Sequence, residues 1–213
     1  DPEWEGEPGD QDQPFITYAK KKISPEDIKF LESSHYQDTK YDVYSTTNTE
    51  AEKKLFRPIG INRNFETHIL QIRNDVEEGI VQWLAFGPNT FNCFVPFYTN
   101  VTTTPASFQT GPDFDLTKIF WLNKLNAQLG DTNYKVYSAL EQAFEEKTMA
   151  KLRQIENETD RAVKGLTGRD LQEKLEEANQ KMADLTYKQT AALTGEMVKD
   201  GHSLMKLKYD LLD

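Results

Sequence analysis

The stretch THILQIRNDVEEGIVQWLAF, residues 67–86, decides the fold of this chain because it has the pattern of a β-hairpin. Residues 67–73 and 80–86 are rich in β-branched, aromatic and other apolar residues, which is the composition of strands. The polar run NDVEEG lies between them, and Gly79 gives the turn a permissive backbone. The sequence therefore predicts two antiparallel strands.

Two flanking stretches extend this hairpin to a predicted meander. FRPIGINR, residues 56–63, precedes the hairpin, and FNCFVPFY, residues 91–98, follows it after a GPN turn. Pro96 cannot donate a hydrogen bond to a neighbouring strand, so the last strand should bend or lie at an edge of the sheet. The strand at residues 80–86 is apolar on both faces, with Ile80, Leu84 and Phe86 on one and Val81, Trp83 and Ala85 on the other. Such a sheet needs cover on both sides.

The stretch ISPEDIKFLESS has a helix start signal ahead of the sheet. Ser24 is a good N-cap and Pro25 suits the first helical position, while the acidic pair after it favours the positive end of the helix dipole. We expect this helix to end near Ser34. Residues 34–54 are polar, rich in tyrosine and without a period, so they predict a long loop.

The second half of the chain is predicted to be helical. DLTKIFWLNKLNAQLG should form a helix that Asp113 or Asp115 caps and Gly130 ends. Two longer runs, one over residues 134–163 and one from residue 169, carry apolar side chains at helical spacing and predict a hairpin. Because fewer than four clean heptads are present, we interpret the hairpin as packing within the chain rather than as a dimerisation arm. A short third helix is expected after Gly201.

The composition limits the classes of partner. The 213 residues include 25 Lys and Arg against 35 Asp and Glu, a formal net charge of −10, which disfavours nucleic acid and anionic membranes. No stretch approaches the roughly 20 apolar residues of a membrane span. A single cysteine excludes an internal disulfide and allows a reducing compartment, so we expect a cytoplasmic protein. Residues 1–22 are predicted to be an extended arm or linker cut from a longer protein, residues 23–130 the sheet-bearing part and residues 131–213 a helical tail.

Cysteine and histidine, which serve as nucleophiles and metal ligands in other proteins, are poorly placed for these roles in this sequence. Cys93 lies among Phe91, Phe94 and Val95, so we interpret it as a core residue rather than a nucleophile. The three histidines, His35, His68 and His202, have no metal-ligand spacing, and we expect neither a metal site nor a cofactor.

Four polar residues remain as candidates. Arg57 and Arg63 bracket a short apolar run, and an arginine at a strand end can clamp a carboxylate through two hydrogen bonds. Glu66 and His68 share one strand face and could act as an acid–base pair. The alternative for all four is an ordinary solvated strand. From the residues alone, no catalytic site is complete.

Four phrases in order carry a family resemblance: ISPEDIKFLESSHYQDTKYD, FRPIGINRNFETHILQIR, VQWLAFGPNTFNCFVPFYTNV and IFWLNKLNA. Together they resemble the C-terminal half of the bacterial dipeptidase A family, which are cysteine-type N-terminal-nucleophile hydrolases. The resemblance covers residues 23–129 and is weaker over the tail, where EEANQKMADL is its main echo. It implies an α+β fold: part of an αββα sandwich of the N-terminal-nucleophile hydrolase type, with an antiparallel meander and a C-terminal helical hairpin.

The resemblance also implies an activity, the hydrolysis of dipeptides. In such enzymes the nucleophile is a cysteine at the mature N-terminus, whose own α-amino group can serve as the base. Residue 1 here is Asp, and Cys93 lies in the meander, so the nucleophile is expected outside this chain and the chain alone should be inactive. Related enzymes place an arginine beside the nucleophile, a role that Arg57 or Arg63 could fill; His68 and Glu66 have weaker claims, as substrate-binding residues.

The expected partners are a dipeptide substrate, the missing N-terminal half and a second copy of the chain. A rival hypothesis is a standalone binding or scaffold module that uses the acidic helical hairpin.

Overall fold

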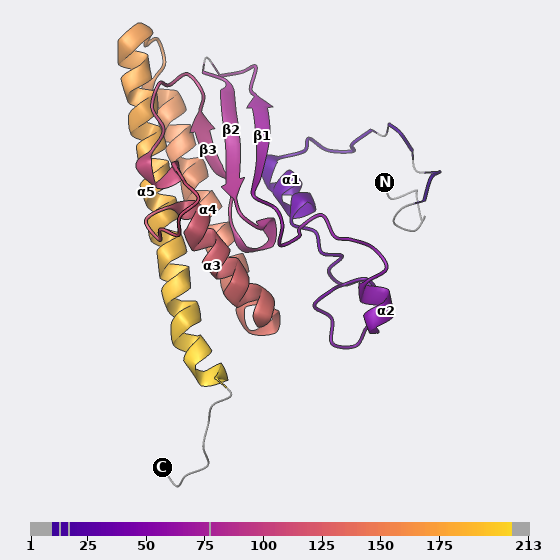
Figure 1. Ribbon diagram of the computed structural model, residues 1–213. Helices are drawn as coiled ribbons and strands as arrows, with labels where there is room; N and C mark the ends of the chain where they lie inside the picture. The colour runs from indigo at the N-terminus through magenta and orange to yellow at the C-terminus, as the bar shows by residue number, and fades with distance from the viewer. Residues whose placement is uncertain (1–9, 13, 17, 77, 206–213) are drawn as a thin grey trace.

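The computed structural model describes residues 10–12, 14–16, 18–76 and 78–205, which form a small antiparallel sheet beside long helices (Figure 1). The sheet has the order β1-β2-β3, with β1 at Glu66–Ile72, β2 at Ile80–Phe86 and β3 at Val95–Tyr98. β1 pairs with β2 in the register that places Ile72 opposite Ile80. The predicted hairpin is confirmed, and so is the edge position of the strand that contains Pro96.

The strand predicted over residues 56–63 is wrong. This segment is a run of turns and bends before β1. The amide of Gly60 donates to the carbonyl of Ser34 at 2.9 Å, and a Cβ at Gly60 would lie 2.5 Å from the carbonyl oxygen of Ser33. The segment therefore packs against the chain after the first helix instead of pairing with β1.

The first helix confirms its start signal. α1 spans Pro25–Glu32, and Ser24 and Asp27 form a reciprocal capping box. Lys29 of this helix is fully buried, and its ammonium donates to the carbonyl of Asn89 at 2.7 Å and to the carboxylate of Glu145 at 2.8 Å. The predicted loop that follows contains a one-turn helix, α2 (Glu50–Lys53).

Three long helices follow the sheet: α3 (Ile119–Thr132), α4 (Tyr134–Ala162) and α5 (Gly168–Gly201). The helical hairpin is confirmed because Leu152, Leu175 and Met182 are buried between its arms and the rest of the core. The short third helix is a 3-10 turn, η3 (His202–Leu204); the rest of its predicted stretch, residues 206–213, lies outside the described residues.

The predicted boundaries of α3 are wrong at both ends. Lys118 is its N-cap residue and provides no side-chain cap, whereas Asp115 accepts hydrogen bonds from the amide and hydroxyl of Thr117. Gly130 does not end the helix. A Cβ there would lie 2.7 Å from the ring of Phe91, so this glycine allows close packing inside the helix.

The two faces of the sheet differ in their cover. The face that carries Trp83 and Tyr98 meets α4: the guanidinium of Arg153 lies 4.3 Å from the Trp83 ring, and Tyr98 donates to the carbonyl of Glu156. Along the β3 edge, the side-chain amide of Asn179 in α5 bonds both the amide and the carbonyl of Tyr98, at 2.9 and 3.0 Å. The free edge of β3 is thereby closed.

The opposite face is covered only in part. The 3-10 turn η2 (Ala106–Phe108) places Phe108 against Phe86 and Phe97 of the sheet. Toward β1 the apolar side chains are open: Leu70 is 65%, Ile72 73% and Ile80 54% exposed. We call these three residues the open face; they form a contiguous apolar surface, because Ile72 pairs with Ile80 and Leu70 lies on the same side of β1.

We expect the chain to self-associate through the open face, most simply as a dimer, because exposed apolar surface beside the free edge of β1 favours association. Replacing Leu70 and Ile72 by glutamine should shift the equilibrium toward monomer in analytical ultracentrifugation, whereas the control Val198→Gln, on the exposed side of α5, should not. A wild-type chain that stays monomeric at high concentration and binds no hydrophobic dye would contradict this expectation.

Candidate functional site

Arg57 and Arg63 lie exposed on the loop that precedes β1 rather than at strand ends. Within the described part of the chain, neither guanidinium makes a hydrogen bond or an ion pair. Glu66 and His68 do meet, because alternate residues of β1 share a face: Nδ1 of His68 lies 2.7 Å from Oε1 of Glu66. That pair is exposed to solvent. The positions of the four residues agree both with a functional role and with ordinary solvated residues.

Cys93 is a core residue, as predicted. Its side chain is buried in the main hydrophobic cluster, and burial raises the pKa of its thiol to about 12. A thiol with that pKa carries almost no thiolate at neutral pH, and the thiolate is the nucleophile. Cys93 is therefore unsuited to attack a peptide bond.

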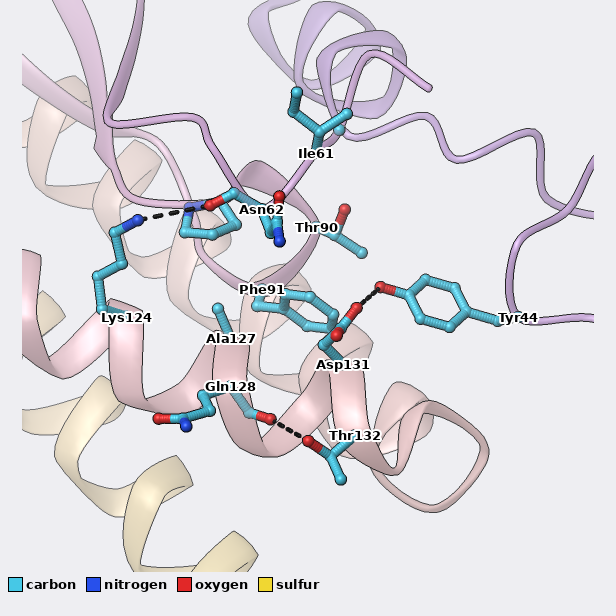
Figure 2. A pocket seen from close by; sticks show the side chains of 12 residues that line it. Tyr44, Ile61, Asn62, Thr90, Phe91, Lys124, Ala127, Gln128, Asp131 and Thr132 are labelled. Carbon is cyan, nitrogen blue, oxygen red and sulfur yellow. Dashed lines mark hydrogen bonds between the residues drawn. The ribbon is translucent and has the colours of Figure 1, made fainter. Parts of the chain in front are cut away.

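A hollow of about 330 Å³ lies directly beside the loop that carries the two arginines (Figure 2). One wall is the loop at residues 60–62, a second is the segment at residues 88–91, and α3 forms the third. Lys124, Ala127, Gln128, Asp131 and Thr132 of α3 line the hollow. Their spacing of three and four residues puts them on one stripe of the helix.

The local sequence fixes the walls of this hollow. Gly60 lets the loop approach the backbone of Ser33, and the 3-10 turn η1 (Asn89–Phe91) packs the buried ring of Phe91 against Gly130 of α3. The amine of Lys124 lies 3.4 Å from the carbonyl of Asn62. The loop and the turn thus both contact α3, through Lys124 and through the Phe91 ring, and the hollow is preformed.

A second hollow, of about 670 Å³, adjoins the first and is mainly aromatic. It is lined by Phe65, Glu66, Phe86, Thr110, Gly111, Pro112, Phe120, Trp121 and Lys124. Lys124 lines both hollows, and its amine lies 4.8 Å from the centroid of the Phe65 ring, within cation–π range. Through Glu66, the Glu66–His68 pair of β1 borders this second hollow.

A polar cluster around the buried His35, which the sequence did not predict, anchors the far end of the first hollow. The ring nitrogens of His35 lie 3.1 Å from a carboxylate oxygen of Asp42 and 3.0 Å from the hydroxyl of Tyr134. Tyr44 stacks on Tyr134 with ring centroids 3.9 Å apart and donates to Asp131 at 2.7 Å. Burial and the bond to Asp131 raise the pKa of the Tyr44 phenol, so it stays a hydrogen-bond donor.

The arginine that the fold buries is Arg73, just after β1. Its guanidinium holds Asp160 of α4 through two hydrogen bonds of 2.7 and 3.1 Å and lies 2.9 Å from Glu156. Tyr98 also donates to Asp160, at 2.8 Å. These contacts join the end of the β1–β2 hairpin to α4. The guanidinium of Arg73 is therefore engaged in holding the fold together and does not face an open site.

Among the residues that the structure describes, the site has binding groups, and the thiol of Cys93 is buried away from it. Within the described residues, no group of three or more histidine, cysteine or acidic side chains could hold a metal ion, and no helix is both long and apolar enough to span a membrane. What the hollows offer is a set of charged, polar and aromatic groups around preformed spaces.

Comparison with known proteins gives consistent matches. The chain is 66% identical over its full length to Dipeptidase A of Lactobacillus helveticus, of which it covers 45%. It is 48% identical over 97% of its length to Probable dipeptidase B of Lactococcus lactis subsp. lactis (strain IL1403), covering 44%, and 33% identical over 98% to Probable dipeptidase of Latilactobacillus sakei, covering 44%. The chain thus spans less than half the length of these relatives, which is consistent with a C-terminal portion of a dipeptidase.

A family model also matches most of the sheet-bearing part. The model described as Peptidase family C69 matches residues 1–147, which include the loop with the two arginines, the sheet and α3. With that match and relatives at 33–66% identity, the chain belongs to peptidase family C69.

Proposed function

We propose that this chain is the C-terminal portion of a cytoplasmic dipeptidase that hydrolyses dipeptides by a cysteine N-terminal-nucleophile mechanism. The observation that carries the proposal is the 66% identity to Dipeptidase A of Lactobacillus helveticus over the whole chain. The nucleophile belongs to the part of such a protein that this chain does not cover. The buried thiol of Cys93 supports that assignment, because its pKa of about 12 leaves this chain without a reactive cysteine.

The open face supports the structural part of the proposal. An αββα sandwich packs two sheets face to face, so each sheet has one face covered by helices and one apolar face toward the other sheet. The sheet here has this asymmetry, with α4 on one face and exposed Leu70, Ile72 and Ile80 on the other. In the proposed enzyme the second sheet comes from the preceding part and covers these residues.

The proposed roles in the site follow from charge and position. Attack on a dipeptide develops negative charge on the carbonyl oxygen, and the substrate also carries a carboxylate; an arginine can stabilise either charge. Arg57 or Arg63 fills this role, because both are exposed and flank the loop at residues 60–62 that lines the first hollow. Glu66 and His68, at the second hollow, contact the substrate.

The test is a reconstitution. The chain alone should hydrolyse no dipeptide, whereas a chimera that joins it to the uncovered part of the Lactobacillus helveticus relative should do so. The uncovered part alone is the control, and the chimera with Cys93→Ala should keep its activity. Hydrolysis by the chain alone that Cys93→Ala abolishes, or an inactive but folded chimera, would overturn the proposal.

Within the active chimera, we expect one of Arg57→Lys and Arg63→Lys to lower kcat/KM about a hundredfold, the usual loss for a charge-stabilising donor, while the other changes it little. Lysine keeps the charge but lacks the planar fork of two donors. Steady-state kinetics locate the role: a fall in kcat places the residue at the transition state, and a rise in KM alone at the substrate carboxylate.

The matched control is Arg169→Lys, which alters an exposed arginine at the start of α5. If both loop variants keep kcat/KM within about threefold of the parent, less than 1 kcal/mol, the two arginines are ordinary solvated residues of the loop.

A further inference from the structure

Opposite charges stand at the two ends of the first hollow. Figure 2 shows Lys124 at one end and Asp131, held by Tyr44, at the other, with Phe91 and Ala127 between them. Both charged residues belong to α3 and are seven residues apart, so they lie two turns apart on the same face of the helix. One rigid element therefore fixes the separation of their two Cα atoms.

Neither charge is neutralised by the described part of the chain. The amine of Lys124 has only a long contact to the carbonyl of Asn62, at 3.4 Å, and aromatic neighbours. Asp131 accepts one hydrogen bond, from Tyr44 to Oδ1, and makes no ion pair. An ammonium and a carboxylate that both keep free bonding capacity toward one space are suited to a ligand with the complementary pair of charges.

The separation of the two Cα atoms can be compared with the length of such a ligand. Seven residues of helix correspond to about 10.5 Å between the two Cα atoms. A dipeptide spans about 7 Å when extended, and an ionic hydrogen bond of about 2.8 Å at each end brings the span to about 12–13 Å. Because the lysine side chain is long and flexible, the ammonium and the carboxylate can reach the separation of about 12–13 Å that a dipeptide needs.

The middle of the hollow suits a peptide unit. Its floor is apolar, made by buried Phe91 and Ala127, and can take a Cα or a small side chain. Asn62 and Thr90 stand on the opposite wall and offer polar groups to a peptide bond. The volume of about 330 Å³ lies at the lower end of the range for small-molecule sites.

We propose that the first hollow binds a free dipeptide, with the substrate carboxylate on Lys124 and the substrate ammonium on Asp131. The choice of a dipeptide over another zwitterion of this length rests on the proposed function; the two binding residues do not. This arrangement favours a free dipeptide over other peptides. A longer peptide would have to leave one charge unpaired, and an end-blocked dipeptide would lack one charge.

The test pairs a change in the protein with a change in the ligand. Titrate the 213-residue chain, followed by NMR, with Ala-Ala, N-acetyl-Ala-Ala and Ala-Ala-amide. In the wild type, each block should weaken binding about tenfold. Asp131→Asn, which keeps an acceptor for Tyr44, should weaken Ala-Ala by the same factor and remove the effect of acetylation. Lys124→Met should do the same for amidation.

Two controls and one parallel assay make the outcome decisive. Lys147→Met on α4 and Asp184→Asn on α5, both exposed and outside the hollow, should leave all three affinities unchanged. No Ala-Ala binding at 20 mM, or an effect of acetylation that persists in Asp131→Asn, overturns the inference. The reconstitution assay separates the two proposals: a chimera that hydrolyses dipeptides with unchanged KM in both variants refutes the binding roles alone, whereas a folded, inactive chimera refutes the proposed function.

Discussion

Arg73→Met should lower the free energy of unfolding by about 3–5 kcal/mol, the usual consequence of removing one partner from a buried ion pair. The Arg73 side chain is 11% exposed, and its guanidinium holds Asp160 by two hydrogen bonds, with Glu156 at 2.9 Å. Methionine leaves the carboxylates of Asp160 and Glu156 in the interior without the positive charge of Arg73. Urea unfolding at neutral pH, followed by circular dichroism, measures the change as a lower midpoint at unchanged slope.

The size of this effect depends on burial and not on the loss of a positive charge. Arg161→Met is the matched control: Arg161 lies on the same end of α4 and is exposed, and within the described residues its guanidinium donates to a carbonyl of its own helix. It should change stability by less than about 0.5 kcal/mol. Arg73→Lys should fall between the two, because lysine keeps the charge but cannot bond both oxygens of Asp160. A loss below 1 kcal/mol for Arg73→Met would show that the network adds little.

Arg73 also shows where inference from the sequence ends. The sequence singled out Arg57 and Arg63 because they flank an apolar run, yet the fold leaves both exposed. For Arg73 the sequence predicts only the end of the strand at residues 67–73. Its partner Asp160 lies 87 residues away on α4, and no local pattern connects them. Pairings of this kind follow from how a helix crosses a sheet, which a one-dimensional pattern does not contain.

The elements themselves were more predictable, because their signals are local. The β1–β2 hairpin, the Ser24 cap and the two arms of the helical hairpin each depend on residues within a few turns of one another. The errors arose where a distant contact decides. Residues 56–63 have strand composition, but Gly60 is held against the backbone of Ser33 and Ser34.

The hollow was not predictable from the sequence for the same reason. Its lining comes from four separate stretches, at residue 44, residues 60–62, residues 88–91 and residues 124–132. Only the last of these has a readable pattern, the three- and four-residue spacing on α3. The charges of Lys124 and Asp131 look like an ordinary solvated helix face until the loop and the turn are placed over them.

Glu141 is a buried acid that opposes folding at neutral pH. Its side chain lies in the interior beside Gly130, and neither carboxylate oxygen has a hydrogen-bond partner in the described part of the chain. Burial raises its pKa from 4.5 to about 8, against a smaller opposing effect of the Lys29 ammonium. In the folded protein the group therefore stays protonated at a pH where the unfolded chain ionises it.

We expect wild-type stability to fall as pH rises from about 4.5 to about 8. Within this window the unfolded state has lost the Glu141 proton and the folded state has kept it, so each pH unit removes about 1.4 kcal/mol, or about 3–5 kcal/mol in all. Glu141→Gln removes this titration. The difference in unfolding free energy between variant and wild type should thus grow in favour of the variant from pH 4.5 to pH 8, measured by urea unfolding at each pH.

The comparison of variant with wild type isolates Glu141, because other raised acids such as Glu156 contribute equally to both proteins. Glu146→Gln, on the exposed side of the same helix, is the control and should show no such growth, because this carboxyl group lies in solvent and not in the interior. A difference that stays constant between pH 4.5 and pH 8 would mean that the folded protein ionises Glu141 as readily as the unfolded chain does. The interior beside Gly130 would then have to solvate a carboxylate, which no hydrogen-bond donor among the described residues is placed to do.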